Sequence, residues 1–278
     1  MKCLTIFAIP LIFTSVVAGA QQVPSPAQNG ASAAVTTPPV RTPLQIAETR
    51  AQILMARKDY AAALDAYQQI LLQDPRNAEV LNQSGIAYQE LGGLDRAKHF
   101  YKMAARADKT FSSPVSNLGT VEFEQRNYGK AISYYNKAIL IANKTPRLDL
   151  DLSTLYLNLG YAYFASQQYP PAMDSFAQAL ALDPNAFEAG GQGGSTLEER
   201  SAQNPGLFFF LIAKIYAKKG DAERAAHYLK IARDDGYENI RSAITDRDFA
   251  AVINDPRVQE VVLVSPSYAP APGKTSSQ

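Results

Sequence analysis

The chain has 278 residues, of which 46% are hydrophobic and 19% are charged, and 27 Lys and Arg balance 26 Asp and Glu. This length and composition fit a folded protein of one or two domains. A nucleic-acid binder needs a basic excess to neutralise phosphates, and an anionic membrane surface attracts clustered Lys and Arg. The balanced charge therefore argues against both nucleic acid and membrane surfaces as partners.

The N-terminus has the pattern of an export signal. Lys2 supplies a positive start, residues 4–17 form an apolar run, and residues 18–20 (Ala-Gly-Ala) supply the small side chains that signal peptidase requires. The run is shorter than the roughly 20 residues of a spanning helix, and Pro10 interrupts it. We expect a signal peptide at residues 1–20, no integral membrane span after its cleavage, and a periplasmic or secreted protein. An uncleaved anchor is the alternative.

Two further segments lack the large apolar residues of a folded core. Residues 21–43 and 265–278 are rich in Pro, Ala, Ser, Thr and Gln and carry almost no charge. Such segments cannot bury enough surface to offset their chain entropy. We expect a disordered linker at residues 21–43 and a disordered tail at residues 265–278.

Between these segments, residues of the same kind recur every 34 positions. The interval separates Ala63, Ala97 and Ala131, and also Tyr67, Tyr101 and Tyr135. The register resumes after an insertion at residues 146–152 and again after one at residues 186–205. A fixed period of this length is typical of solenoid proteins.

Each of the five units has small residues at two equivalent positions. The first set is Ala51, Gly85, Gly119, Gly160 and Ala213, and the second is Ala63, Ala97, Ala131, Ala172 and Ala225. Two helices can approach closely only where the side chains at their contact are small. The pattern therefore predicts that each unit is a pair of tightly packed helices.

This period and alternation resemble the tetratricopeptide repeat over about residues 44–236. The resemblance implies an all-α fold, a tetratricopeptide-type α-solenoid of about five helix-turn-helix repeats with a helical C-terminal cap. The expected parts are a four-repeat block at residues 44–185, a flexible Gly-rich loop at residues 186–205, and the fifth repeat with its cap at residues 206–264. The apolar residues expected to cover the last repeat are Ile240, Ile244, Phe249, Val252, Ile253, Val258 and Val261.

The insertions and two departures from the pattern lead to further predictions. Residues 146–152 should lengthen the first helix of the fourth unit. The glycines of residues 190–194 are costly in a helix and should form a mobile loop between the four-unit block and the last unit. Arg50 stands at a usually apolar position, as suits a first unit with one face in water, and Glu122 stands where an aromatic usually packs.

Side chains for catalysis are scarce. His99 and His227 fall at the same place in different units and are interpreted as surface residues, and Cys3 precedes the apolar run. Asp149 and Asp151 lack the Gly and Glu of a calcium loop. We expect no catalytic residue, no metal site and no cofactor. An enzyme with a site across residues 186–205 is the remaining catalytic alternative.

The resemblance implies that the first helices line a concave groove for a partner peptide or helix. Its motif positions here are Glu48, Gln52 and Met55, then Asn82, Ile86 and Gln89, then Ser116, Thr120 and Phe123, then Leu157, Tyr161 and Phe164, and in the last unit Phe210, Lys214 and Ala217. The aromatic residues among them either anchor a ligand or pack between neighbouring helices.

Chaperone-binding members of the family hold a C-terminal carboxylate with a clamp that contains lysine and arginine. The matching positions here are Glu48, Gln52, Gln83, Ser113 and Asn117. None of these side chains is a cation. Recognition of an acidic chain terminus is therefore not expected.

These observations favour an exported, non-catalytic protein–protein interaction scaffold that binds a partner peptide or helix in its groove. The alternative is an accessory glycan- or lipid-binding protein that uses the aromatic groove of the fourth unit. Self-association through the last unit is a further alternative.

Overall fold

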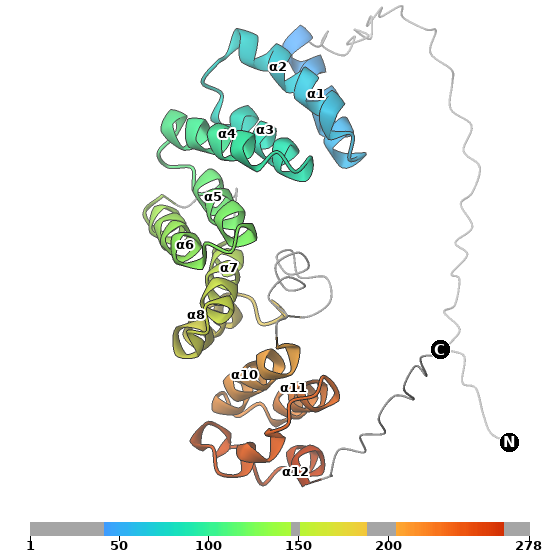
Figure 1. Ribbon diagram of the computed structural model, residues 1–278, viewed down its shortest axis with the longest axis vertical. Coiled ribbons are helices and arrows are strands. Elements are labelled where there is room, and N and C mark those ends of the chain that lie inside the picture. The colour runs from blue at the N-terminus through green and yellow to red at the C-terminus, as the bar shows by residue number, and fades with distance from the viewer. Residues whose placement is uncertain (1–41, 146–150, 188–203, 264–278) are drawn as a thin grey trace, which may run out of the picture. The chain divides into compact units, whose positions relative to one another are not determined.

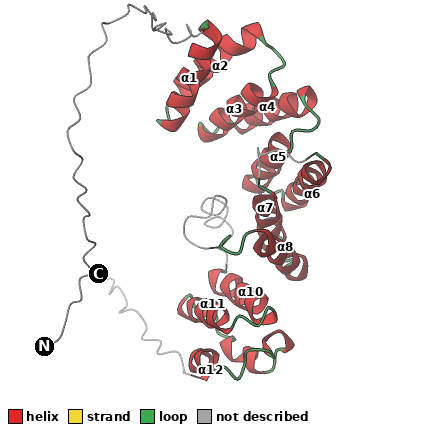
Figure 2. Ribbon diagram, turned by 180° about the vertical axis from the view of Figure 1, so that it is seen from behind, coloured by secondary structure: helices red, strands yellow, loops and turns green. Residues whose placement is uncertain are grey.

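The computed structural model describes residues 42–145, 151–187 and 204–263, and in this part of the chain all regular elements are helices (Figures 1 and 2). Consecutive helices pack on one another in pairs. The first four pairs are α1 (Pro43–Ala56) with α2 (Tyr60–Gln73), α3 (Ala78–Glu90) with α4 (Leu94–Ala107), α5 (Ser113–Glu124) with α6 (Tyr128–Lys144), and α7 (Leu152–Ala165) with α8 (Tyr169–Leu182).

The fifth pair is followed by a helical cap. It consists of α10 (Pro205–Lys218) and α11 (Ala222–Asp234), and the cap consists of η1 (Ile240–Ile244), η2 (Arg247–Phe249) and α12 (Pro256–Leu263). The cap packs on the last pair through contacts of α12 with α11 and of η2 with α10. The predicted solenoid of five helix pairs with a helical C-terminal cap is confirmed.

Every pair turns through a residue in the left-handed backbone region. These equivalent residues are Lys58, Gly92, Arg126, Gln167 and Gly220, with φ of 60°, 76°, 61°, 61° and 76°. The next residue then donates its backbone N–H back to the first helix, as from Gly93 to Tyr88 at 2.8 Å. Such a bond satisfies a carbonyl that the end of a helix would leave without a partner. The turn is therefore a repeated helix-end motif.

The small residues lie where the two helices of a pair cross. A Cβ atom built on Gly85 or Gly119 would lie 2.5 Å or 2.8 Å from the ring of Tyr101 or Tyr135. On Gly160 it would lie 2.4 Å from the ring of Phe176. Because these distances are far below van der Waals contact, the glycine and the ring of the same unit fit only as a pair. This explains the small positions in the repeat.

Glu122 is accommodated inside the joint between the second and third units. It is 3% exposed, its carboxylate pairs with Lys98, and Asn127 Nδ2 donates to Oε2 at 2.9 Å. Burial raises the pKa of the Glu122 carboxyl, but the hydrogen bonds from Lys98 and Asn127 outweigh it and hold that pKa below its ordinary value. A polar network thus forms at the position that Tyr88, Tyr163 and Tyr216 occupy in three other units.

The prediction that residues 146–152 lengthen the next first helix is wrong. The helix α7 begins at Leu152 and has 14 residues, and the side chain of Asp151 accepts a hydrogen bond from the Ser153 N–H at 3.3 Å and so caps it. The additional length lies before the insertion instead, because α6 has 17 residues. Residues 146–150 lie outside the described residues.

The fifth pair packs directly on the fourth. The ring of Phe208 on α10 lies 5.7 Å, 5.5 Å and 5.6 Å from the rings of Tyr161, Phe164 and Phe176. Phe187, assigned to the loop from the sequence, contacts Phe208 at 6.1 Å. One hydrophobic core therefore runs from the third unit into the cap. The glycines of residues 190–194 lie outside the described residues.

The cap covers the last unit as predicted, with one exception. Ile240, Phe249, Val252 and Val258 are buried, whereas Ile244 is 47% exposed. In a 3₁₀ helix, residues three apart share a face. Ala243 is therefore buried together with Ile240, and Ile244 is not. The assignment of Ile244 to the cap core is therefore wrong.

The N-terminal border of the fold is close to the expected one. The helix α1 begins at Pro43, where Thr42 and Gln45 form a capping box. The predicted signal peptide, most of the predicted linker and the predicted tail lie outside the described residues. In the described part of the chain, no helix combines the length and apolar character needed to cross a membrane.

Candidate functional site

The predicted groove residues of the third and fourth units are part of the core. Tyr161 and Phe164 are 1% and 4% exposed and pack on Phe208. Phe123 packs on Tyr128 with ring centroids 5.3 Å apart. Of the two alternatives for these rings, packing between helices is the one observed. The glycan- or lipid-binding alternative thereby loses the exposed rings that it requires.

Three other predicted positions, in the second, third and fourth units, also face the interior. Leu157 and Ser116 are buried, and Ile86 of the second unit packs against the cluster around Tyr101 and Leu118. In the last unit, Phe210 and Ala217 are buried as well. Continuous stacking of the first helices brings their equivalent faces together, so these side chains fill the joints between units.

Polar groove residues join the second unit to the third. Asn117 Nδ2 donates to Asn82 Oδ1 at 3.0 Å, and Gln89 Nε2 donates to Glu124 Oε1 at 2.8 Å. Both bonds connect first helices, α3 and α5, at residues 35 apart in the sequence. These side chains therefore hold neighbouring repeats together.

Two more of the predicted groove residues contact the hydroxyl groups of tyrosines on the second helices. The Tyr101 hydroxyl donates to Gln89 Oε1 at 2.8 Å, and the Tyr135 hydroxyl lies 3.2 Å from Thr120 Oγ1. Burial is the main cause that raises the pKa of both tyrosines above its ordinary value. Gln89 and Thr120 are thus partners of buried hydroxyls within their own units.

An open cavity remains in the first two units. Its volume is about 570 Å³, and its lining includes Gln52, Met55 and Asn82, which the sequence placed in the groove. The lining also includes Glu48, Gln83 and Ser113, the positions that match the carboxylate clamp. We call this cavity the N-terminal groove. The predicted groove residues thus meet in an open site here, between α1, α3 and the start of α5.

The N-terminal groove has an apolar floor and a polar wall without positive charge. Val80 and Phe111 contribute apolar surface, and Glu48 and Glu79 contribute carboxylates. No lysine, arginine or histidine belongs to its lining in the described part of the chain. A carboxylate ligand would meet negative charge in this groove.

Tyr67 lies in this groove and was not predicted as a site residue. It is 5% exposed, and its hydroxyl forms no hydrogen bond with any described residue. Burial raises the pKa of the Tyr67 hydroxyl. In the repeat register Met55 stands where Gln89 stands in the second unit, so Tyr67 lacks the acceptor that Tyr101 has. Comparing position 55 of the first unit with position 89 of the second could have identified Tyr67 from the sequence.

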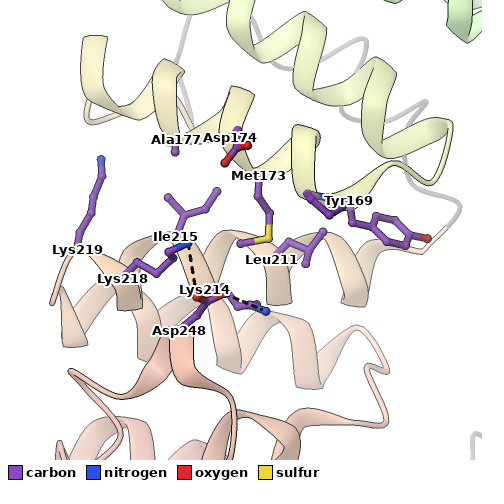
Figure 3. Close-up of a pocket in the computed structure, with 11 residues that line it drawn as sticks. Tyr169, Met173, Asp174, Ala177, Leu211, Lys214, Ile215, Lys218, Lys219 and Asp248 are labelled. Atoms are coloured by element: carbon purple, nitrogen blue, oxygen red, sulfur yellow. Dashed lines mark ion pairs between the residues drawn. The ribbon is translucent and has the colours of Figure 1, made fainter.

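A second cavity of about 450 Å³ lies between α8 and α10 (Figure 3). Met173 of α8 points toward α10, where Leu211 and Ile215 form the opposite wall. Two of its lysines are ion-paired, because Lys214 Nζ lies 2.8 Å from Asp246 and Lys218 Nζ lies 3.5 Å from Asp248. These pairs attach α10 to the η2 region.

The predicted surface histidines are exposed, as expected. His99 and His227 lie on α4 and α11, each beside a ring on its own helix. Of the acidic pair in the insertion, Asp151 caps α7 and Asp149 lies outside the described residues. Among the described residues, no group of His, Cys, Asp and Glu could hold a metal ion.

Comparison with known proteins agrees with the fold. Two family models described as tetratricopeptide repeat match residues 54–118 and 112–185. The chain is 34% identical over 85 residues to the heat-shock protein cognate co-chaperone sgt12 of Aspergillus fumigatus, which covers 31% of this chain and 25% of that protein. It is 30% identical over 131 residues to the BBSome complex member BBS4 of Bos taurus, which covers 46% of this chain and 24% of that protein.

The chain spans about a quarter of the length of these curated relatives. Among solved structures, that of pilF of Pseudomonas aeruginosa superposes with a TM-score of 0.50 at 19% identity, covering 78% of this chain and 87% of that chain. This likeness concerns the fold alone. Residues 54–185 are therefore tetratricopeptide repeats, the start of α1 precedes them, and the helix pair after them continues the same solenoid.

Proposed function

We propose that this chain is a non-catalytic scaffold that binds a segment of a partner protein in the N-terminal groove. The observation that carries the proposal is the open cavity of about 570 Å³ at α1 and α3, at positions where the other units are closed by packing. Repeat solenoids of this kind use extended concave surfaces for binding. The volume lies in the range of pockets that enclose a ligand.

The groove offers both parts of a peptide-binding surface. Met55 and Val80 supply apolar area that an anchoring side chain would bury, and Gln52 and Gln83 are exposed amides that would bond to a peptide backbone. The partner segment would contact residues of α1 and α3 together. Its binding therefore requires the first two repeats to be folded against each other.

Export from the cytoplasm is the second part of the proposal. It is supported by the positive start, the apolar run and the Ala-Gly-Ala of residues 18–20. Fractionation of the native host followed by N-terminal sequencing should find the protein in the periplasm or medium with Gln21 as its first residue. A cytoplasmic protein that keeps residues 1–20 would contradict this part alone.

Site-specific photocrosslinking tests the groove. A photoreactive residue at Gln52 or Gln83 should form an adduct of one defined mass in the native extract. The same residue at Lys102, which is exposed on α4 and outside the lining, should form none. Gln52→Trp should prevent the adduct at position 83 by filling the cavity. Equal adducts at position 102, or an adduct insensitive to the tryptophan, would refute the proposal.

A further inference from the structure

We infer that the N-terminal groove selects a peptide segment in which a lysine or arginine lies beside an apolar residue, and that the Tyr67 hydroxyl donates a hydrogen bond to a backbone carbonyl of that segment. This inference rests on the proposed function and specifies the chemistry of the bound segment. It can fail while the proposed function stands.

The first argument is the Tyr67 hydroxyl. Its counterparts in the next two units, Tyr101 and Tyr135, both have a partner on their own first helix. Tyr67 packs in the core of the first unit, but it has Met55 where an acceptor would be, and it lines the cavity. No described residue accepts a hydrogen bond from the Tyr67 hydroxyl, and the residue lines a space large enough for a ligand. A peptide carbonyl in the groove would supply the missing acceptor.

The second argument is charge. The carboxylate of Glu48 forms no hydrogen bond or ion pair with any described residue, although the residue is half-buried. The described lining has no cation. A cationic side chain of the bound segment would therefore be attracted, and an acidic one would be repelled.

The third argument is the apolar floor. Met55, Val80 and Phe111 lie in the same cavity as Glu48. A lysine or arginine side chain has a long apolar stem and a charged tip, and an adjacent apolar residue extends the buried area. The floor and the carboxylate together fit such a pair of residues better than either a purely apolar or an acidic segment.

The experiment is a selection of random twelve-residue peptides displayed on phage against the full chain. The inference expects selected peptides to be enriched in lysine or arginine next to leucine, isoleucine, methionine or phenylalanine. Groove-dependent peptides that are acidic, or that show no bias in charge, would overturn the inference and leave the proposed function intact. If no peptide is enriched, or if all of them bind the Gln52→Trp variant equally well, the proposed function itself fails.

Affinities of a selected peptide test the individual residues by fluorescence anisotropy. Tyr67→Phe should weaken binding about fivefold to tenfold by removing the donor. Met55→Gln should weaken it to a similar extent, because it gives Tyr67 the internal acceptor that Gln89 gives Tyr101. Glu48→Gln should weaken it severalfold at low salt and by less at high salt. Unchanged affinity in Tyr67→Phe would overturn the assignment of the hydroxyl.

Two variants serve as controls. Asp65→Asn removes a carboxylate of α2 outside the lining and should leave the affinity unchanged. Tyr101→Phe removes a hydroxyl that is already bonded to Gln89, so it should lower the melting temperature and leave peptide binding intact. Tyr67→Phe should not lower the melting temperature, because its hydroxyl has no bond to lose. Equal thermal destabilisation by both tyrosine variants would contradict the inference.

Discussion

Lys98 of α4 and Glu122 of α5 form an ion pair inside the joint between the second and third repeats. The carboxylate is almost completely buried, whereas the side chain of Lys98 is 21% exposed. Removing one member of such a pair leaves the other charge in an apolar surrounding, which is more costly than replacing both.

Lys98→Met should therefore lower the free energy of unfolding by about 2 kcal/mol, less than for a fully buried pair because the lysine reaches solvent. The double variant Lys98→Met with Glu122→Met should recover most of this loss, since two apolar side chains can fill the joint. Urea unfolding at pH 7 measures the free energy of unfolding of the single and the double variant. A double variant that is no more stable than the single one would contradict the explanation.

The same pair predicts a pH dependence. The folded pKa of Glu122 lies below its ordinary value of 4.5, so the associated stability is present above that pH and is lost as the pH falls through the folded pKa. The double variant should therefore lose less stability than the wild type between neutral and strongly acidic pH. Parallel acid titrations followed by far-UV circular dichroism would show the difference.

Gly160 tests the crossing of the two helices in the fourth unit. Gly160→Ala would place a Cβ atom 2.4 Å from the ring of Phe176, so we expect a loss of about 2 kcal/mol through forced repacking. Gly129 is a matched control, because it lies in α6 and has no atom within 4 Å of an added Cβ. Gly129→Ala should gain about 0.5 kcal/mol through helix propensity. Equal effects would refute the steric argument.

Phe208 tests whether the last repeat depends on the fourth. Phe208→Ala removes four ring contacts that join α10 to Tyr161, Phe164, Phe176 and Phe187, and should cost about 3 kcal/mol. Hydrogen exchange should quicken in α10, α11 and α12 more than in α1 to α4, because stability in a solenoid is transmitted between neighbours. Uniformly faster exchange would instead indicate a single cooperative unit.

Lys214 and Asp246 give a second pH-dependent contact. Burial raises the pKa of the Asp246 carboxyl, but the hydrogen bonds from Lys214 and from the Asp248 N–H outweigh it and hold that pKa below its ordinary value of 3.8. Its stabilisation is thus present at neutral pH and lost in acid. Asp246→Asn should lower the free energy of unfolding by about 1 kcal/mol at pH 7 and by almost nothing near pH 2. Denaturant unfolding at the two pH values checks this.

The periodicity of the sequence was sufficient for the fold. Small residues at Gly85, Gly119 and Gly160 recur because each must accept the ring of its partner helix, so the pattern directly records a packing requirement. The repeat pattern did not predict the contacts of Phe208. These contacts depend on how α10 meets α8 across the inserted residues, and that geometry is absent from the repeat register.

The groove was predicted only in part, for a similar reason. A register shows which residues share a face, but not whether the neighbouring unit covers that face. Tyr161 and Asn82 share the groove-facing register, yet the first is buried under Phe208 and the second bonds to Asn117 at the edge of an open cavity. Burial by the next repeat is a long-range property, and it decides which predicted positions remain available.

The left-handed residue in every turn has a consequence for recombination of the chain. Gly92 and Arg126 occupy the same backbone conformation, so deletion of residues 93–126 would join Gly92 to Asn127 in a geometry that both turns already use. The fused hairpin would place Gly85 opposite Tyr135, a ring that already faces a glycine in its own repeat. Each turn is thus a natural splice point, at which a gene could lose or duplicate one repeat without creating a new type of junction.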